Sequence, residues 1–243
     1  MDDTKYRFGY DSLAYFGKVN ASISHELKNI MAIISETAGL LSDLSDMASS
    51  GKPVESDMLA SCTDSITEEI QRGFATIRQM NRFSHSVDTP VGSVNLTDVL
   101  DIVINLSGYL SFSGKTSLSP CNGFEPIAST CPFILQAILY ETLVYTFKNK
   151  KPEMETGISI QPQGDSAWRI IFSGFSANEL EPFPNIATET MAASIDITIH
   201  CDSAAGQIEL VVPLIIENLA AQPVSQATPD GGESSQKHAK LGR

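Results

Sequence analysis

Positive charge is scarce in this sequence of 243 residues. Lysine and arginine together number 16 against 29 aspartates and glutamates, so the formal net charge is -13 at pH 7. Proteins that bind nucleic acids neutralise backbone phosphates with lysine and arginine side chains. We therefore expect no binding of DNA or RNA, and a protein is the expected partner of so acidic a chain.

Long apolar runs and a secretion signal are also missing. No apolar stretch reaches the roughly 18 residues that a membrane span needs, and the start, MDDTKYRFGYDS, lacks the apolar core of a secretory signal. We therefore expect a cytoplasmic protein without a membrane segment. A hydrophobic content of 42% is nevertheless ample for the core of one large domain or two small ones.

Cysteine is rare, and its spacing fits neither a disulfide framework nor a zinc site. The four cysteines include no Cys-x-x-Cys pair; they are Cys62, Cys121, Cys131 and Cys201. His200 precedes Cys201, but neighbouring residues of a strand point to opposite faces of the sheet. We therefore expect buried free thiols and no metal bound by this chain.

The sequence does contain a long amphipathic helix with one histidine off its apolar stripe. Residues 11–48 include no proline and would form a rod of roughly 55 Å. Apolar residues repeat every seven positions along two lines, Phe16, Ile23, Ile30 and Leu27, Ile34, Leu41. His25 lies outside both lines and should face water. Residues three and four apart are neighbours on a helix, so its neighbours should be Ser22, Lys28 and Asn29.

His25 could act as a nucleophile, because an exposed neutral imidazole is reactive near pH 7. A group that holds one ring nitrogen as N–H leaves the other nitrogen free to attack. The carboxylate of Glu26 could be that group if it adopts a suitable rotamer. A lone histidine on a charged helix is more commonly a solvated residue without a function. The residues around His25 favour a function here.

Residues 22–29, SISHELKN, resemble the H box of bacterial sensor histidine kinases. In that family the histidine accepts a phosphoryl group and the acidic residue after it assists as acid or base. An Asn or Thr four positions after the histidine orients water. The resemblance assigns these roles, in order, to His25, Glu26 and Asn29. It also makes two neighbours candidate contacts for a partner, Ser22 and Lys28.

A second helix is expected after SSGKP at residues 49–53, which is a turn signal. The heptad resumes there and predicts an antiparallel helical hairpin over residues 11–86. Such a hairpin has one apolar face too many, and pairing two hairpins into a four-helix bundle would cover it. The histidine kinase family has this arrangement. We therefore expect a homodimer through Phe16, Ile23, Leu27, Ile34, Ile70 and Ile77.

A second domain is expected to follow VDTPVGS at residues 87–93, which mixes proline, glycine and serine. Residues 94–216 should form an α/β sandwich, which makes the fold class α+β. Asn95 can cap its first helix, and Pro132 begins its second. The expected helices are residues 96–110 and 132–148, and the expected strand pairs are 157–163 with 167–175 and 195–201 with 207–214. Residues 221–243 are expected to be a disordered tail.

This second domain resembles the ATP-binding domain of histidine kinases, but its nucleotide-binding residues are missing. Tyr140 and Val144 stand where that family has asparagines, and an apolar valine cannot ligate Mg²⁺. The box that reads adenine is reduced to Ser173, Gly174 and Ser176. Residues 184–194 contain no glycine, so the lid that cradles phosphates is absent. We expect this domain to keep the fold without binding ATP.

A phosphoacceptor beside an ATP site without its ligands indicates a histidine phosphotransfer protein of a two-component phosphorelay. It would move phosphoryl groups between His25 and aspartates in the receiver domains of response regulators. This chain would bind no cofactor, and Mg²⁺ would sit on the partner receiver. Three alternatives stay open: a response-regulator phosphatase, a non-catalytic pseudokinase that inhibits a receiver or kinase, and a residual ATP site. The order of residues 26–29 also resembles the motif used in receiver dephosphorylation.

Overall fold

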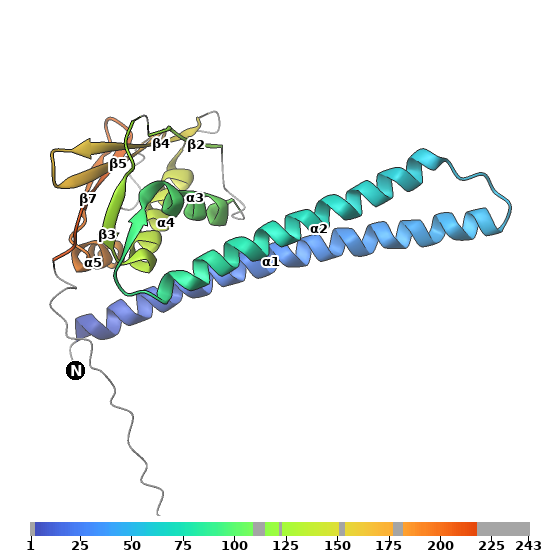
Figure 1. Ribbon diagram of the computed structural model, residues 1–243, viewed down its shortest axis with the longest axis horizontal. Coiled ribbons are helices and arrows are strands. Elements are labelled where there is room, and N and C mark those ends of the chain that lie inside the picture. The colour runs from blue at the N-terminus through green and yellow to red at the C-terminus, as the bar shows by residue number, and fades with distance from the viewer. Residues whose placement is uncertain (1–2, 109–114, 122, 151–153, 177–181, 218–243) are drawn as a thin grey trace, which may run out of the picture.

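Two long antiparallel helices, here called the hairpin, extend well beyond the rest of the molecule (Figure 1). The computed structural model describes residues 3–108, 115–121, 123–150, 154–176 and 182–217. Helix α1 spans Asp3–Ser49, and helix α2 spans Ser56–Ser84. Gly51 turns the chain between them at φ 80°, a left-handed conformation that glycine adopts without strain. The expected tail, residues 221–243, lies outside the described residues.

The second domain combines helices with a five-stranded sheet, which confirms the predicted α+β class. The sheet order is β2-β4-β5-β7-β6, with β2 parallel to β4 and the other pairs antiparallel, and β1 pairs separately with β3. The strands are β1 Gly92–Asn95, β2 Thr116–Leu118, β3 Ile127–Thr130, β4 Thr156–Gln163, β5 Ala167–Ser173, β6 Thr198–Asp202 and β7 Gln207–Pro213. The helices are α3 Leu96–Ser107, α4 Pro132–Asn149 and α5 Ile186–Ser194, and a short 3-10 helix, η1 His85–Val87, follows α2.

Local signals explain where several of these elements begin. The side chain of Asn95 accepts a hydrogen bond of 2.9 Å from the backbone N–H of Thr97, so the predicted cap of α3 is confirmed. Pro132 begins α4, as predicted. Helix α5, whose cap is Asn185, is absent from the prediction, which treats residues 184–194 only as a lid without glycine.

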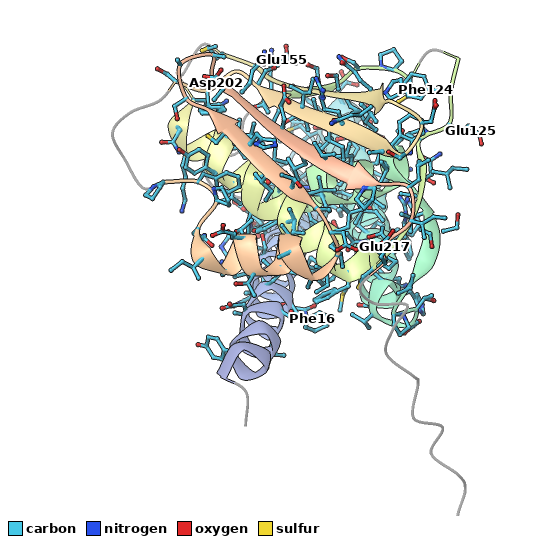
Figure 2. All side chains as sticks on the ribbon, turned by 90° about the vertical axis from the view of Figure 1, so that its left-hand side faces the viewer. Phe16, Phe124, Glu125, Glu155, Asp202 and Glu217 are labelled. Carbon is cyan, nitrogen blue, oxygen red and sulfur yellow. The ribbon has the colours of Figure 1, made fainter. Side chains whose placement is uncertain are left out.

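The core of the second domain lies between one face of the sheet and its helices (Figures 1 and 2). Alternate residues of β5 and β7 are fully buried there, namely Ile170, Phe172, Ile208, Leu210 and Val212. Helix α4 is buried on most of its sides, as expected of a helix that is apolar nearly all round. It is covered by the sheet on one side and by the hairpin on another.

An aromatic cluster, defined as Tyr15, Phe16, Phe83, Phe133 and Tyr140, joins the hairpin to the second domain. The ring centroid of Tyr15 on α1 lies 5.7 Å from that of Phe83 on α2 and 5.3 Å from that of Tyr140 on α4. Such aromatic pairs contribute about 0.5–1.5 kcal/mol each beyond the area that they bury. Burial raises the pKa of the Tyr15 hydroxyl. The two parts of the chain therefore share one hydrophobic core.

This shared core corrects part of the predicted dimer contact. Phe16, on the stretch of α1 below the second domain in Figure 2, stacks on Phe83 with ring centroids 5.3 Å apart. Ile23 is only 1% exposed within a single chain. A heptad shows that a residue is apolar, but not which partner covers it. Ile23 is therefore buried within one chain and is not free to pair two copies, and Phe16 is half-buried by its contact with Phe83.

The described residues also test the expectations for membrane and cysteine. None of the described helices has the length and apolar character that crossing a membrane would require. All four cysteines are free thiols, as predicted. Only Cys62 is buried, however, and the other three are half-buried.

Candidate functional site

His25 lies on the exposed side of α1, midway along the hairpin. Lys28 and Asn29 are exposed with it, and Ser22 is half-buried. Ile23 and Ile30 are buried on the opposite side of the helix. The imidazole therefore stands on a rigid helix, with its ring open to a partner.

Asn29 is the residue whose side chain contacts the ring of His25. Its Nδ2 atom lies 3.3 Å from Nδ1 of His25, four residues away along the helix. A carboxamide has both an N–H₂ donor and a carbonyl acceptor. As placed, the Nδ2 amide donates to Nδ1, which leaves the ring proton on Nε2. A half-turn of the carboxamide would bring its oxygen to the ring instead, so that Nδ1–H donates to it and Nε2 is free to attack. Asn29 can therefore stabilise either ring tautomer, including the one that a nucleophile needs.

The structure does not bring Glu26 to the ring, although the sequence suggested this contact. One step along a helix turns the side chain by about 100°, so Glu26 points toward α2 while His25 points outward. Glu26 is only 7% exposed and forms an ion pair with Arg72 of α2. A buried carboxylate requires such a partner. Any acid–base role of Glu26 stays a prediction.

Arg72 is a candidate functional residue that the sequence analysis missed. Its Nη1 donates to both carboxylate oxygens of Glu69, at 3.2 and 3.3 Å, while its Nη2 pairs with Glu26. Partial burial lowers the pKa of Arg72, but the two carboxylates outweigh it and raise that pKa overall. The spacing of Glu69 and Arg72 was visible in the sequence, but the pair with Glu26 depends on how α1 and α2 align.

Tyr140 and Val144, the residues compared with the asparagines of an ATP site, serve packing. Tyr140 is buried in the aromatic cluster, and burial raises its pKa to about 12. Val144 lines a hollow of about 230 Å³ together with Tyr145 and Phe183. These two rings stack with centroids 4.7 Å apart. The hollow is smaller than the roughly 300–1,000 Å³ of most ligand pockets, and Mg²⁺ would find no oxygen ligand at Val144.

The residues compared with the adenine box in the sequence also have structural roles. Gly174 has φ 97°, and a Cβ atom there would collide with the backbone oxygen of Glu155. Ser173 Oγ donates to the backbone oxygen of Gly157 at 3.3 Å. The backbone geometry thus explains why glycine stands at position 174 without a nucleotide. Among the described residues, no group of three His, Cys, Asp or Glu side chains could hold a metal.

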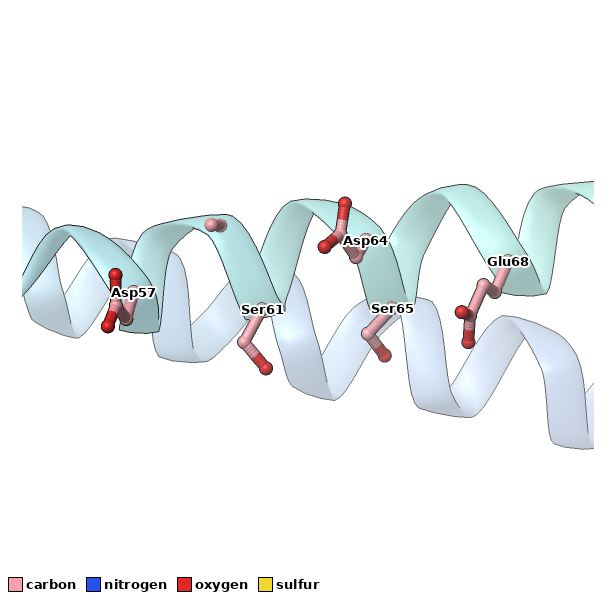
Figure 3. Close-up of a pocket in the computed structure, with 6 residues that line it drawn as sticks. Asp57, Ser61, Asp64, Ser65 and Glu68 are labelled. Carbon is pink, nitrogen blue, oxygen red and sulfur yellow. The ribbon is translucent and has the colours of Figure 1, made fainter.

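An acidic hollow of about 430 Å³ lies along α2, nearer the turn of the hairpin than His25 (Figure 3). Carboxylates and hydroxyls at helical spacing line it, from Asp57, Ser61, Asp64, Ser65 and Glu68. It is open to solvent along one side of the helix. This negative surface agrees with the scarcity of lysine and arginine in the sequence.

Three comparisons with known proteins give a structural likeness only. No family model and no curated protein matches the chain. A bacterial phosphotransferase is similar with a TM-score of 0.43 and 11% identity, over 82% of this chain and 95% of its own. Histidine kinase AdeS of Acinetobacter baumannii has a TM-score of 0.42 and 10% identity, over 78% and 98%. The catalytic domain of histidine kinase ThkA has a TM-score of 0.41 and 10% identity, over 53% and 100%.

These similar structures are, by name, histidine kinases and a phosphotransferase, the class that residues 22–29 resemble. Their identities and TM-scores are too low to carry an inference about function. The function has to be inferred from the residues of this chain.

Proposed function

We propose that this protein is a histidine phosphotransfer protein of a two-component phosphorelay, in which His25 carries the phosphoryl group. The observation that supports this most directly is the exposed ring of His25, with the amide of Asn29 at its Nδ1 atom. When the Asn29 carboxamide turns its oxygen to the ring, the proton is held on Nδ1, and Nε2 is presented to an incoming acyl phosphate. The donors and acceptors would be the aspartates of response-regulator receiver domains.

The transfer needs no proton to leave the ring. Nε2 of His25 attacks the phosphorus atom in line, forming the N–P bond while the bond to the receiver aspartate breaks. The aspartate leaves as a carboxylate with the electron pair, and the proton stays on Nδ1. Mg²⁺ on the receiver neutralises the phosphoryl oxygens, so this chain needs no metal of its own. The reverse steps return the phosphoryl group to a second receiver.

The second domain, in this proposal, does not supply phosphate from ATP. The side chains at the former asparagine positions support this, because Tyr140 packs against the hairpin and Val144 is apolar. Delivery of a γ-phosphate would also require the domain to move over His25. The aromatic cluster and the ion pair of 2.9 Å between Lys18 and Glu141 oppose that movement.

The hairpin, in this proposal, pairs with a second copy through a face that the chain leaves uncovered. Met31 is 63% exposed and Phe74 is 59% exposed, and Ile70 and Ile77 are exposed beside Phe74 on α2. Met31 lies six residues after His25, which is about 120° around the helix. Two-fold pairing through this face would bury these side chains and leave His25 open.

The direct test is incubation of the full chain with a phosphorylated receiver domain and Mg²⁺. Label on this chain that is stable to base and labile to acid indicates phosphohistidine, and His25→Gln should remove it. If the chain releases free phosphate from the receiver, and Asn29→Ala stops that release while His25→Gln only weakens it, the protein is a phosphatase. Binding of the receiver without movement of label indicates a pseudokinase.

A further inference from the structure

Arg72 and His25 lie on the same face of the hairpin. A Cβ atom at Gly73 would lie 3.7 Å from Ile30, so these two residues mark where α1 and α2 face each other. His25 comes five residues before Ile30, which places it about 140° around α1 from the contact with α2. Arg72 comes one residue before Gly73, which places it about 100° around α2 from the contact with α1. In an antiparallel pair, two residues that both precede the contact by such a rotation, one on each helix, lie on the same side of the pair. The ion pair with Glu26 places Arg72 at the level of the residue next to His25.

The guanidinium of Arg72 has donors left for a ligand. Glu26 and Glu69 contact its Nη2 and Nη1 atoms, yet 47% of its side chain stays exposed. A guanidinium carries five N–H donors in a planar fork that fits phosphate oxygens. Because two carboxylates flank it, the side chain is restrained as well as charged. It is held as a cation on the face of the hairpin that also carries His25.

We infer that Arg72 is a catalytic residue that donates hydrogen bonds to the phosphoryl group on its way to and from Nε2 of His25. Glu26 is then a positioning residue, which acts by holding Arg72 and does not touch the phosphoryl group or the ring. During transfer, negative charge is spread over three phosphoryl oxygens, and the N–H groups of Arg72 stabilise it. This inference rests on the proposed function of His25. The alternative is that Glu26 and Arg72 only clip the two helices together.

The first experiment measures the rate at which the full chain takes label from a phosphorylated receiver. Arg72→Gln should slow the transfer roughly 10–100-fold, the scale of a lost charge-assisted hydrogen bond to a transferring group. Arg72→Lys should retain part of the rate, because it keeps the charge but loses the fork. The matched control is Arg78→Gln on another side of α2, which should leave the rate unchanged. An Arg72→Gln variant as fast as the wild type would overturn the inference.

A small donor separates contact with the phosphoryl group from docking of the receiver. Nε2 of His25 can attack phosphoramidate, whose P–N bond breaks as ammonia leaves from the already protonated nitrogen. Arg72→Gln should slow this reaction by a similar factor. A loss of rate confined to the receiver would place Arg72 in the docking surface and overturn its catalytic role. A wild-type chain that takes label from neither donor would remove both the proposed function and this inference.

A double-mutant cycle tests the role of Glu26. If Glu26 acts through Arg72, then Glu26→Gln should slow transfer in the wild type but not in the Arg72→Gln background. An equal loss in both backgrounds would show that Glu26 acts on His25 directly and would overturn its positioning role. Arg72→Gln leaves the buried Glu26 unpaired and can impair folding. The double variant lacks the unpaired charge of Glu26. Its transfer rate, compared with the transfer rate of Glu26→Gln alone, therefore still measures the effect of Arg72.

Discussion

The hairpin and the second domain differ in how much of their apolar surface is covered. On the hairpin, large residues such as Met31, Phe74 and Ile77 are exposed. In the second domain, Leu135, Leu139 and Leu143 of α4 are fully buried. Exposed apolar faces in a folded chain mark surfaces for other proteins, whereas a closed core serves stability. In the proposed function the hairpin is the part that meets partners, and the second domain packs against it through the shared core.

The polar residues repeat this contrast. The hairpin presents His25, Asn29 and Arg72 on one open face. The second domain has placed packing residues, Tyr140 and Val144, where its resemblance to an ATP-binding domain would require ligands. The candidate site residues thus lie on the exposed element, and the corresponding positions of the domain beside it serve packing.

The largest effect should come from removing the phosphoacceptor. His25→Gln should abolish label acceptance from phosphorylated receivers, because no other group on that face can take its place. Folding should be unchanged, since the side chain lies outside the core, and circular dichroism melting can verify this. The matched control is His85→Gln, another exposed histidine, which should keep full activity. Full acceptance by the His25 variant would contradict the proposed mechanism.

The second largest effect should come from a charge placed on the uncovered apolar face of the hairpin. Phe74→Glu should convert a dimer to a monomer, because the charge would be desolvated in the interface without a partner. Analytical ultracentrifugation at micromolar concentration measures this directly. Ser61→Glu, which lies about 140° around α2 from Phe74, adds the same charge and should leave the dimer intact. A wild-type chain that sediments as a monomer would contradict the proposed homodimer.

The shared core should couple the two regions in unfolding. Phe83→Ala should destabilise the protein by about 3–5 kcal/mol, the usual effect of truncating a buried phenylalanine. Trp168 is the only tryptophan and lies in the second domain, so its fluorescence reports that domain. We expect the fluorescence and the helical circular dichroism to shift together in urea. A shift in the helical signal alone would mean that the hairpin and the second domain unfold independently.

A smaller effect is expected at Asn29. Its contact with the ring is a neutral hydrogen bond, which contributes about 0.5–1.5 kcal/mol. Asn29→Ala should therefore slow phosphohistidine formation by no more than roughly 10-fold, measured with the same receiver as donor. Loss of receiver dephosphorylation with unchanged histidine labelling would instead favour the phosphatase alternative.

We expect the protein not to bind nucleotides. Isothermal titration calorimetry with millimolar ATP, with and without Mg²⁺, should show no binding, because Val144 offers no ligand and Tyr145 stacks on Phe183. ADP is a suitable second ligand, since it tests the base and ribose without the γ-phosphate. Binding of either nucleotide, or labelling of His25 from ATP alone, would revive the alternative of a residual ATP site.

The parts of the fold that periodicity and caps specify could be predicted. The heptad predicted two long helices, and Asn95 and Pro132 marked two helix starts. Periodicity shows that a residue is apolar, but not what covers it. The heptad therefore predicts Ile23 in a contact between two copies, whereas in the structure Ile23 packs within one chain. The boundaries predicted for the two domains stay predictions, because the aromatic cluster crosses between them.

The candidate site was predictable only along one helix. The four-residue spacing from His25 to Asn29 indicates a contact that the structure shows. The 100° turn between neighbouring residues already argued against Glu26 holding the same ring. Arg72 could not be found in this way, because its place beside Glu26 depends on how two distant segments align. Reasoning along the first helix alone cannot find the residues that the second helix contributes to the site.

The aromatic cluster also has a consequence for the affinity of any partner that touches both regions. Binding is weaker when association must order flexible parts of the two proteins, because the conformational entropy that they lose opposes binding. Here Tyr15, Phe83 and Tyr140 have fixed the second domain against the hairpin before any partner arrives. Such a partner meets a preorganised surface and gives up little conformational entropy of this chain on binding.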